Sequence, residues 1–236
     1  MNIRKEIKRV IAVQAASLFE LTKHIGPDYE KAVNVIHHSR GKVVVTGIGK
    51  SGLIAQKIAS TFSSIGTPAI FLHPSEGVHG NLGLIDKKDV VIAIGKSGES
   101  EELLAILPFI QKIGAQIICI TANKKSTLAR HSKVILLTPM RREVCPLNLA
   151  PTTSSTMALV VGDALAISLM KLRNFSPEMF AMYHPGGLIG KKLFLKVKDI
   201  MRGGAHNPVV SIKDSLAKLL IEITRKGAGA VSVVDG

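Results

Sequence analysis

Two glycine-rich stretches of the chain carry hydroxyl and ammonium groups of the kind that bind phosphate. The first covers residues 47–52, includes Gly49, Lys50 and Ser51, and follows a β-branched apolar run at 43–45. Glycines allow a tight turn that points backbone N–H groups at an anion, and the positive end of a following helix adds to the attraction. The stretch therefore predicts a phosphate-binding loop between a buried strand and a helix.

The glycine spacing distinguishes this loop from two nucleotide-binding patterns. A Walker A loop requires a glycine five positions before Gly49, where this chain has Val44, so that pattern is excluded. The dinucleotide pattern G-x-G-x-x-G matches the three glycines, but it also needs an acidic residue near the end of the second strand. That strand, predicted at 69–72, leads into His73, and the nearest acid is Glu76. A dinucleotide site is therefore the weaker interpretation.

A second loop of the same kind favours a phosphate site. The apolar run at 90–94 breaks into residues 95–100, and a cluster of hydroxyls at 152–156 opens a long apolar helix. One such cluster alone would be an ordinary helix cap. Three clusters near helix N-termini suit one phosphate monoester held by hydroxyls and backbone amides. The predicted ligands are Gly49, Ser51, Ser97, Gly98, Ser100, Thr152 and Ser155.

In this order and spacing, the motifs resemble those of the sugar isomerase (SIS) domain proteins, and within that group the D-arabinose 5-phosphate isomerases. The resemblance covers the chain from Gly41 onward, and members of that group usually carry two CBS motifs after the SIS domain. The stretches that carry the resemblance are 49–52, 76–80, 97–100, 143–152, 162–165 and 184–187.

The resemblance implies an aldose–ketose isomerase that interconverts D-arabinose 5-phosphate and D-ribulose 5-phosphate through an enediol-type intermediate. Its product would supply synthesis of the eight-carbon acid sugar of bacterial lipopolysaccharide or capsule. Moving a proton between C1 and C2 requires a phosphate anchor, a base and donors for the developing oxyanion. No cofactor and no metal site is predicted, although two His and two Glu near one site could trap a divalent ion.

The catalytic positions of the family correspond to five polar residues of this chain. His184, before a predicted tight turn, is the first candidate for the C1–C2 proton transfer, because imidazole titrates near neutrality. His79, which is expected in a loop between Val78 and Gly80, would assist ring opening or proton movement between the two oxygens. Glu143 is the second candidate base. Glu102 is expected to orient Lys50 or a histidine, and Lys50 to face the phosphate or the enediolate.

The second loop departs from the family pattern at Lys96, where related chains more often have a small or polar residue. This extra cation is expected to influence substrate preference. Two alternative functions stay open: isomerisation of another sugar phosphate, and non-catalytic sensing of one. SIS-containing regulators normally carry a helix-turn-helix domain, for which the roughly 40 residues before Gly41 are too few.

The composition is that of a folded, basic protein. The 236 residues are 46% hydrophobic and 20% charged, with a formal net charge of +14. Positive charge attracts nucleic acid, but aromatic residues make up only 4% and no recognition motif is present. We expect a field that favours anionic substrates, and no nucleic-acid partner. The densest basic cluster is Lys191, Lys192, Lys196, Lys198 and Arg202.

The sequence indicates a cytoplasmic protein without a membrane anchor. Only Cys119 and Cys145 occur, which gives neither a disulfide framework nor a zinc-binding spacing. The N-terminal segment begins with basic residues, but its apolar residues recur at helical spacing among Glu6, Gln14 and Glu20. This pattern predicts an amphipathic helix rather than a signal peptide, and no apolar run is judged long enough to span a bilayer.

Strand-like and helix-like runs alternate along most of the chain. The alternation predicts an α/β fold, a three-layer αβα sandwich around a five-stranded parallel sheet, with the ligand beyond the carboxyl ends of the strands. The resemblance implies the flavodoxin-like strand order. The predicted strands include residues 43–45, 69–72, 90–94, 116–121 and 134–137.

The domain assignment places the SIS domain at residues 1–195 and the first part of a CBS motif at 196–236. Half a CBS unit cannot bury its own faces, so the segment beyond Met201 is expected to be poorly ordered or to pack on a neighbour. An intact CBS pair would bind a nucleotide or sugar-nucleotide effector. The resemblance also suggests a homotetramer in which His184 reaches a neighbour's site.

Overall fold

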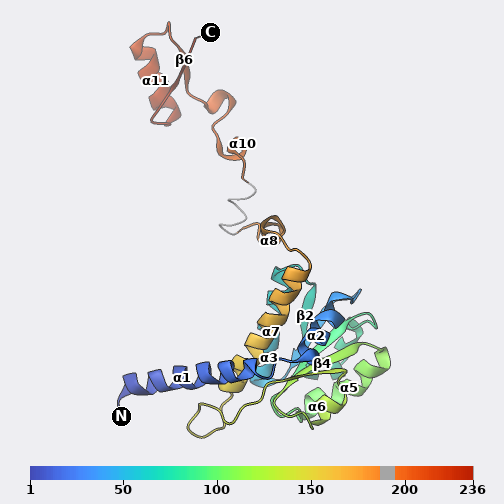
Figure 1. Ribbon diagram of the computed structural model, residues 1–236. Coiled ribbons are helices and arrows are strands. Elements are labelled where there is room, and N and C mark those ends of the chain that lie inside the picture. The colour runs from blue at the N-terminus through green and yellow to red at the C-terminus, as the bar shows by residue number, and fades with distance from the viewer. Residues whose placement is uncertain (187–194, 236) are drawn as a thin grey trace. The chain divides into compact units, whose positions relative to one another are not determined.

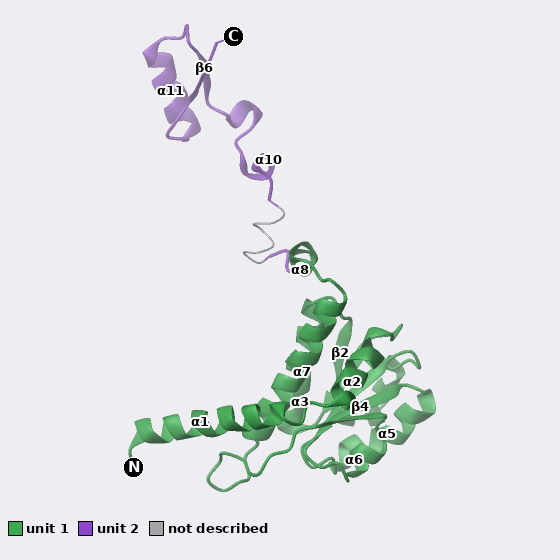
Figure 2. Ribbon diagram, viewed as in Figure 1, with its two compact units in different colours: residues 1–183 green, residues 184–236 purple. Residues whose placement is uncertain are grey.

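The computed structural model describes residues 1–186 and 195–235. The chain divides into two compact units, residues 1–183 and residues 184–236 (Figure 2). Three residues from the sequence-based assignments, Gly187, Lys191 and Lys192, lie outside the described residues. The domain boundary predicted after residue 195 stays a prediction.

A five-stranded parallel sheet forms the centre of the larger unit. The strand order is β2-β1-β3-β4-β5, which confirms the predicted parallel sheet and its flavodoxin-like order. In register, Val43 of β1 lies opposite Ala69 of β2 on one side and Val90 of β3 on the other. The strands are β1 (Val43–Gly47), β2 (Ala69–Leu72), β3 (Val90–Ile94), β4 (Gln116–Thr121) and β5 (Val134–Leu137).

Helices cover both faces of this sheet, as predicted (Figure 1). Successive side chains of a strand point to opposite faces, so Val43 and Val45 pack with α2, α3 and α7, whereas Val44 packs with α5 and α6. The helical elements of this unit are α1 (Ile3–Thr22), α2 (Pro27–His37), α3 (Gly49–Ser64), α4 (Pro74–Val78), the 3-10 turn η1 (Asn81–Leu84), α5 (Glu101–Ile113), α6 (Thr127–Arg130), α7 (Thr153–Leu172) and α8 (Pro177–Tyr183).

The segment before His79 differs from the sequence-based expectation. We expected His79 to lie in an open loop, but residues 74–78 form the short helix α4 and His79 is its C-cap. Pro74 begins this helix, at a position where the missing N–H and the fixed φ of proline do no harm. His79 therefore projects from a helix end, where its backbone N–H bonds to the Glu76 carbonyl oxygen at 3.2 Å.

α7 is the core helix of the larger unit. Among the described residues it is the one helix that is long and apolar enough, by length and composition, to cross a membrane, a feature that the sequence analysis missed. Its buried residues Met157, Val161, Leu165 and Leu169 recur every four positions and pack with α3 in the core. Burial against protein, rather than lipid, explains the apolar composition of this face.

α1 is amphipathic as predicted, but most of its apolar residues stay exposed. Its N-cap residue Asn2 accepts a hydrogen bond from the backbone N–H of Lys5 at 3.1 Å. Leu21 is its buried residue, whereas Ile3, Ile7 and Ile11 are 65%, 55% and 63% exposed. This apolar helix face has no partner among the described residues of the larger unit.

The smaller unit contains a strand, a helix and a second strand. β6 and β7 pair in parallel, and the helix α11 connects them. Val210 is buried, whereas Leu216, Leu220 and Ile221 of α11 are more than half exposed. This burial agrees with the expectation that the segment does not bury its own faces; its assignment to a CBS motif stays a prediction. The elements are α10 (Val197–Ile200), η2 (Gly204–His206), β6 (Val209–Ser211), α11 (Leu216–Lys226) and β7 (Ser232–Val234).

We predict that Thr46→Val stabilises the protein. The Thr46 hydroxyl, near the end of β1, is completely buried and has no hydrogen-bond partner among the described residues. Valine has the same branched shape without the hydroxyl, so the free energy of unfolding in urea should rise by about 1 kcal/mol. Thr121→Val is the control, because that buried hydroxyl donates to the Lys96 carbonyl oxygen and its removal should destabilise. A destabilised Thr46→Val would show that the hydroxyl is used.

Candidate active site

The two glycine-serine loops leave the same edge of the sheet from neighbouring strands. β1 pairs with β3 in register, Gly47 opposite Ile94, so the carboxyl ends of the two strands lie side by side. α3 follows β1 and covers one face of the sheet, whereas α5 follows β3 and covers the other. Ligands of open α/β sheets bind where the connections change face in this way. The structure therefore brings the loops that carry Ser51 and Ser97 to one edge.

The first loop, residues 47–52, turns directly into α3. A Cβ at Gly52 would lie 2.8 Å from the Gly47 carbonyl oxygen, so only glycine allows the backbone to turn this closely. Ile48, the N-cap residue, supplies no side-chain cap to α3. Backbone N–H groups of the first turn therefore point outward, where an anion can accept from them. Lys50 is exposed and Ser51 is half-buried in this turn.

The second loop, residues 95–100, is held more firmly. Gly98 has a φ of 70° and a Cβ there would overlap the Ser126 side chain, so glycine is required. The Ser97 hydroxyl accepts a hydrogen bond from the backbone N–H of Glu99 at 3.3 Å. Glu99 in turn accepts from the first backbone N–H of α6 at 2.8 Å. Ser100 is the N-cap residue of α5 and makes no side-chain cap bond.

The Glu143 carboxylate occupies the N-terminus of α7. Its side chain is completely buried. One carboxylate oxygen accepts from the backbone N–H groups of Thr152 and Ser154 at 3.0 and 3.1 Å and from the Thr152 hydroxyl at 3.2 Å. The other accepts from the Ser154 hydroxyl at 2.6 Å. An anion at this helix end is stabilised both by the N–H donors and by the helix dipole.

These donors change the acidity of Glu143. Burial, the largest single influence, raises its pKa, but the hydrogen bonds from Ser154, Lys96 and the backbone of Thr152 outweigh burial and lower the pKa from 4.5 to about 2. The carboxylate is therefore ionised at every pH at which the protein would work. A carboxylate with so low a pKa is a weak base.

Lys96 connects the second loop to this carboxylate. Its ammonium nitrogen lies 2.9 Å from a Glu143 oxygen, and its side chain is 42% exposed. The ion pair therefore ties together the second loop and the start of α7. The sequence predicts that Lys96, a departure from the family pattern, influences substrate preference. Its partner could not be identified from the sequence, because Glu143 lies 47 positions away.

The third hydroxyl cluster is used differently from the phosphate site that we expected. Thr152, a predicted phosphate ligand, donates its hydroxyl to Glu143. Ser154, which we did not single out, donates its hydroxyl to Glu143 at 2.6 Å. Ser155 is half-buried and has no side-chain hydrogen bond among the described residues. In this structure the protein's own carboxylate thus occupies the helix end that we assigned to phosphate.

The remaining predicted catalytic residues lie on other elements. Glu102 is exposed in the first turn of α5, and His79 is exposed at the end of α4. His184 belongs to the smaller unit, so its relation to the two loops stays a prediction. Within residues 1–186 and 195–235, no three His, Cys, Asp or Glu side chains gather as a metal site.

The sequence is similar to characterised sugar-phosphate isomerases along most of its length. Residues 36–168 match the SIS domain family. The chain is 46% identical to "Arabinose 5-phosphate isomerase KdsD" of Yersinia pestis over 97% of this chain and 70% of that protein. It is 47% identical to the KdsD of Francisella tularensis over 94% of this chain and 69% of that protein.

A solved structure shows the same fold with a bound ligand. It is that of E. coli CFT073 c3406 in complex with arabinose 5-phosphate, which aligns with a TM-score of 0.76 and 41% sequence identity. The alignment covers 78% of this chain and all of that one. The sequence identity exceeds the level at which only the fold is shared.

We predict that the contribution of Glu143 to stability is complete above about pH 4.5 and decreases below it. Its pKa is lower in the folded protein than the ordinary value of 4.5, so its contribution is present above that pH and is lost as the pH falls towards about 2. The unmodified protein and Glu143→Gln should differ in their free energy of unfolding, and this difference should shrink by on the order of 3 kcal/mol over this window. Denaturant titrations between pH 6 and pH 2.5 measure the difference.

Glu101→Gln serves as the control, since it removes an exposed carboxylate from the first turn of α5. The Glu101 side chain makes no hydrogen bond or ion pair among the described residues, so its replacement should change the free energy of unfolding little. A pH-independent difference for Glu143→Gln would contradict the carboxylate's role at the N-terminus of α7.

Proposed function

The chain belongs to the SIS domain family and, within it, to the arabinose 5-phosphate isomerases, and from this premise we propose that it interconverts D-arabinose 5-phosphate and D-ribulose 5-phosphate. The observation that carries the proposal is the 46% identity to KdsD over 97% of the chain. The juxtaposed loops after β1 and β3 supply a suitable phosphate site. The product would enter the synthesis of the eight-carbon acid sugar of lipopolysaccharide or capsule.

The reaction moves one proton between two carbons of an open-chain sugar. A base removes the proton from C2 of the aldose, and the electrons form the C1–C2 double bond of an enediolate whose negative charge lies on O1. A proton passes from O2 to O1, the C2 carbonyl of the ketose forms, and a proton is returned to C1. The phosphate holds the substrate at the loops, so that the reacting carbons lie at a fixed distance from the edge of the sheet. No electron leaves the sugar, so this reaction requires no redox cofactor.

The roles of the polar residues follow from their surroundings. The first loop and Ser97, Gly98 and Ser100 of the second hold the phosphate, and the exposed Lys50 stabilises the enediolate. The saturated carboxylate of Glu143 suits it to positioning rather than to proton removal. The C1–C2 proton transfer therefore falls to His184. His79 assists ring opening, and Glu102 orients a neighbouring polar group.

The exposed apolar faces favour assembly of several copies. α1 exposes Ile3, Ile7 and Ile11, and α7 exposes Val160 and Ile167 at 40% and 48%. Burial of such faces stabilises an oligomer by removing apolar surface from water. We assign a homotetramer in which His184 of one copy serves a neighbour's site, and a nucleotide or sugar-nucleotide effector to a complete CBS pair.

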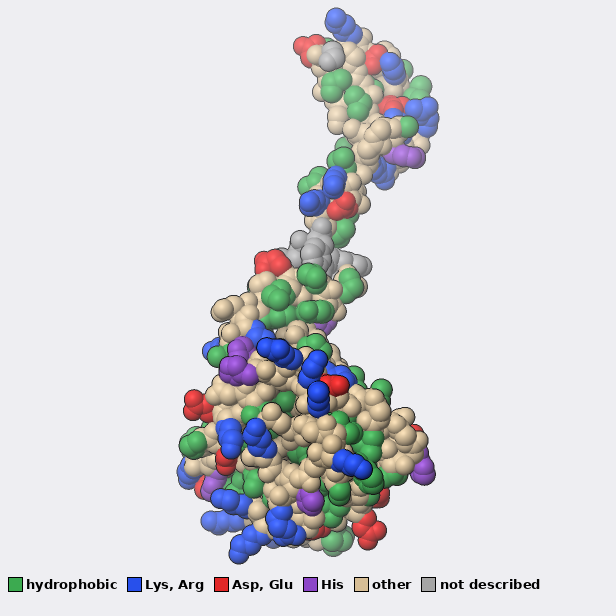
Figure 3. Space-filling view, turned by 90° about the vertical axis from the view of Figure 1, so that its right-hand side faces the viewer, with side chains coloured by type: hydrophobic (Ala, Val, Ile, Leu, Met, Phe, Trp, Pro, Cys, Tyr) green, Lys and Arg blue, Asp and Glu red, His purple; other side chains and the backbone are tan. Residues whose placement is uncertain are grey.

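The surface charge fits a small anionic substrate better than a nucleic acid. On the face shown in Figure 3, Lys and Arg side chains are scattered over the larger unit among neutral and acidic ones. A nucleic-acid site would concentrate them in one stripe or patch. A cytoplasmic location agrees with the sugar-phosphate substrate and with two free cysteines.

A second candidate function is the isomerisation of a different sugar phosphate. Lys96 raises this alternative, because related chains more often have a small or polar residue at this position, next to Ser97 of the predicted phosphate site. Assays with pentose, hexose and heptose phosphates separate the candidates. The proposal expects arabinose 5-phosphate to give the highest kcat/KM.

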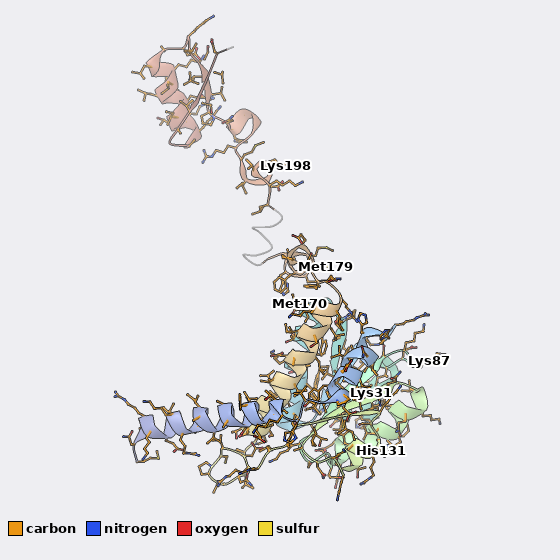
Figure 4. The ribbon with its side chains drawn as sticks, viewed as in Figure 1. Lys31, Lys87, His131, Met170, Met179 and Lys198 are labelled. Atoms are coloured by element: carbon orange, nitrogen blue, oxygen red, sulfur yellow. The ribbon has the colours of Figure 1, made fainter. Side chains whose placement is uncertain are left out.

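We predict that His184→Ala and His79→Ala lose activity while remaining folded. A general acid or base contributes roughly 100- to 10,000-fold to the rate, so kcat for arabinose 5-phosphate should fall within that range. His131→Ala is the matched control. His131, labelled in Figure 4, is the C-cap residue of α6 and lies just before β5 begins, at the amino end of the strand rather than at the carboxyl ends where the two loops lie. Near-full activity of a folded His184→Ala would remove that residue from the mechanism.

Lys50→Ala is predicted to be equally damaging for a different reason. An ammonium that stabilises the enediolate acts in the transition state, and losing such a donor lowers kcat by roughly 100- to 1,000-fold. KM should change much less, which a full saturation curve would show. A raised KM with unchanged kcat would instead place Lys50 on the phosphate.

A further inference from the structure

We infer that Lys96 is a phosphate-binding residue: its ammonium, fixed by Glu143 at the edge of the second loop, donates to the phosphate of the substrate. The inference rests on the proposed function in taking a sugar phosphate as the ligand. Four observations carry it: where Lys96 lies, how its backbone is held, how its side chain is held, and how the local charge balances.

Lys96 lies within the predicted phosphate site. It is the second residue of the loop that follows β3, and Ser97 is its direct neighbour. The loop after β1 leaves the same edge on the adjacent strand. A cation at this position can face the anion held by the two loops.

The backbone of Lys96 is fixed on the side towards β4. Its carbonyl oxygen accepts hydrogen bonds from the Ala122 backbone N–H at 3.0 Å and from the Thr121 hydroxyl at 3.1 Å. Thr121 itself is buried at the end of β4. The start of the lysine side chain therefore has a defined position before any ligand binds.

The far end of the side chain is fixed by Glu143. The ammonium nitrogen is 2.9 Å from the carboxylate, whose own side chain is completely buried and cannot move away without breaking its other bonds. An ammonium has three N–H donors. Glu143 takes one, and the described residues provide no further acceptor for the other two. With a side chain 42% exposed, those donors are accessible to a ligand.

The charges next to Lys96, which are the Glu143 carboxylate and the N-terminus of α7, leave a net positive charge beside the second loop. Three of the hydrogen bonds from Thr152 and Ser154 go to one Glu143 oxygen, and one goes to the other oxygen, which also faces Lys96. The N-terminus of α7 adds roughly half a positive charge. Lys96 and Glu143 balance each other, and Glu99, the other carboxylate of the loop, accepts from the start of α6 instead. The half charge of the α7 N-terminus is therefore left to attract a phosphate monoester.

Pre-organisation is the advantage of this arrangement. A lysine on a free surface loses side-chain freedom when it binds an anion, which weakens the binding. Lys96 is already held at both ends, so it loses less side-chain freedom on binding, and more of its electrostatic attraction contributes to the affinity for the ligand. The expected consequence is discrimination between phosphorylated and unphosphorylated sugars.

The test uses two variants that separate charge from anchoring. Lys96→Met removes the charge and the hydrogen bond to Glu143, whereas Lys96→Gln removes the charge but keeps an amide that can donate to it. Inorganic phosphate and arabinose 5-phosphate are titrated into each by calorimetry. Both variants should bind each ligand at least about tenfold more weakly, and Lys96→Arg should stay within about threefold of the unmodified protein.

Lys87→Met is the matched control. Lys87 is exposed and precedes β3, so it lies at the opposite end of the strand that Lys96 follows (Figure 4). Its loss removes the same formal charge and should leave phosphate affinity unchanged.

Turnover by Lys96→Gln should show a raised KM with kcat kept within about threefold.

The outcomes are distinct. Unchanged phosphate affinity in a folded Lys96→Gln overturns the inference, and so does failure of both Lys96→Gln and Lys96→Met to fold, since the ion pair would then be structural. Phosphate titration does not depend on turnover. If the unmodified protein isomerises no sugar phosphate, the proposed function fails while the role of Lys96 is still measured.

Discussion

The candidate site depends on the hydrogen bonds and the ion pair that surround the buried Glu143 carboxylate. A charge removed from water costs several kcal/mol unless donors replace the solvent, and here two backbone N–H groups, two hydroxyls and one ammonium replace it. Those donors come from the start of α7 and from the loop after β3. Because these donors must stay around the buried anion, two segments that are far apart in the sequence are held together.

The parallel sheet explains why these segments meet. Because β1 and β3 are neighbours while their helices cover opposite faces, both glycine-serine loops open at one edge. α7 packs along α3 on one of these faces, through residues such as Val161 and Leu165. Strand order positions the first two hydroxyl clusters, and helix packing brings the third within reach of Lys96.

The fold could be predicted closely, because its signals are local. Runs such as 43–45 and 90–94 are apolar throughout, as a parallel strand buried on both faces requires, and glycine with serine marks each turn into a helix. The use of the third hydroxyl cluster could not be predicted. A helix N-terminus attracts any anion, and nothing local to Thr152 shows whether that anion is a ligand or a carboxylate from the chain itself.

The same carboxylate bears on which group moves the proton. A base must accept a proton from carbon and then release it, so its pKa should lie near the working pH. Glu143, with a pKa of about 2, holds a proton too weakly. To raise that pKa, the protein would have to break hydrogen bonds that also hold the second loop in place, and phosphate binding would weaken with them. Imidazole titrates near neutrality without such a rearrangement, so proton transfer by histidine and anchoring by Glu143 are compatible roles, whereas the two roles in Glu143 alone would conflict.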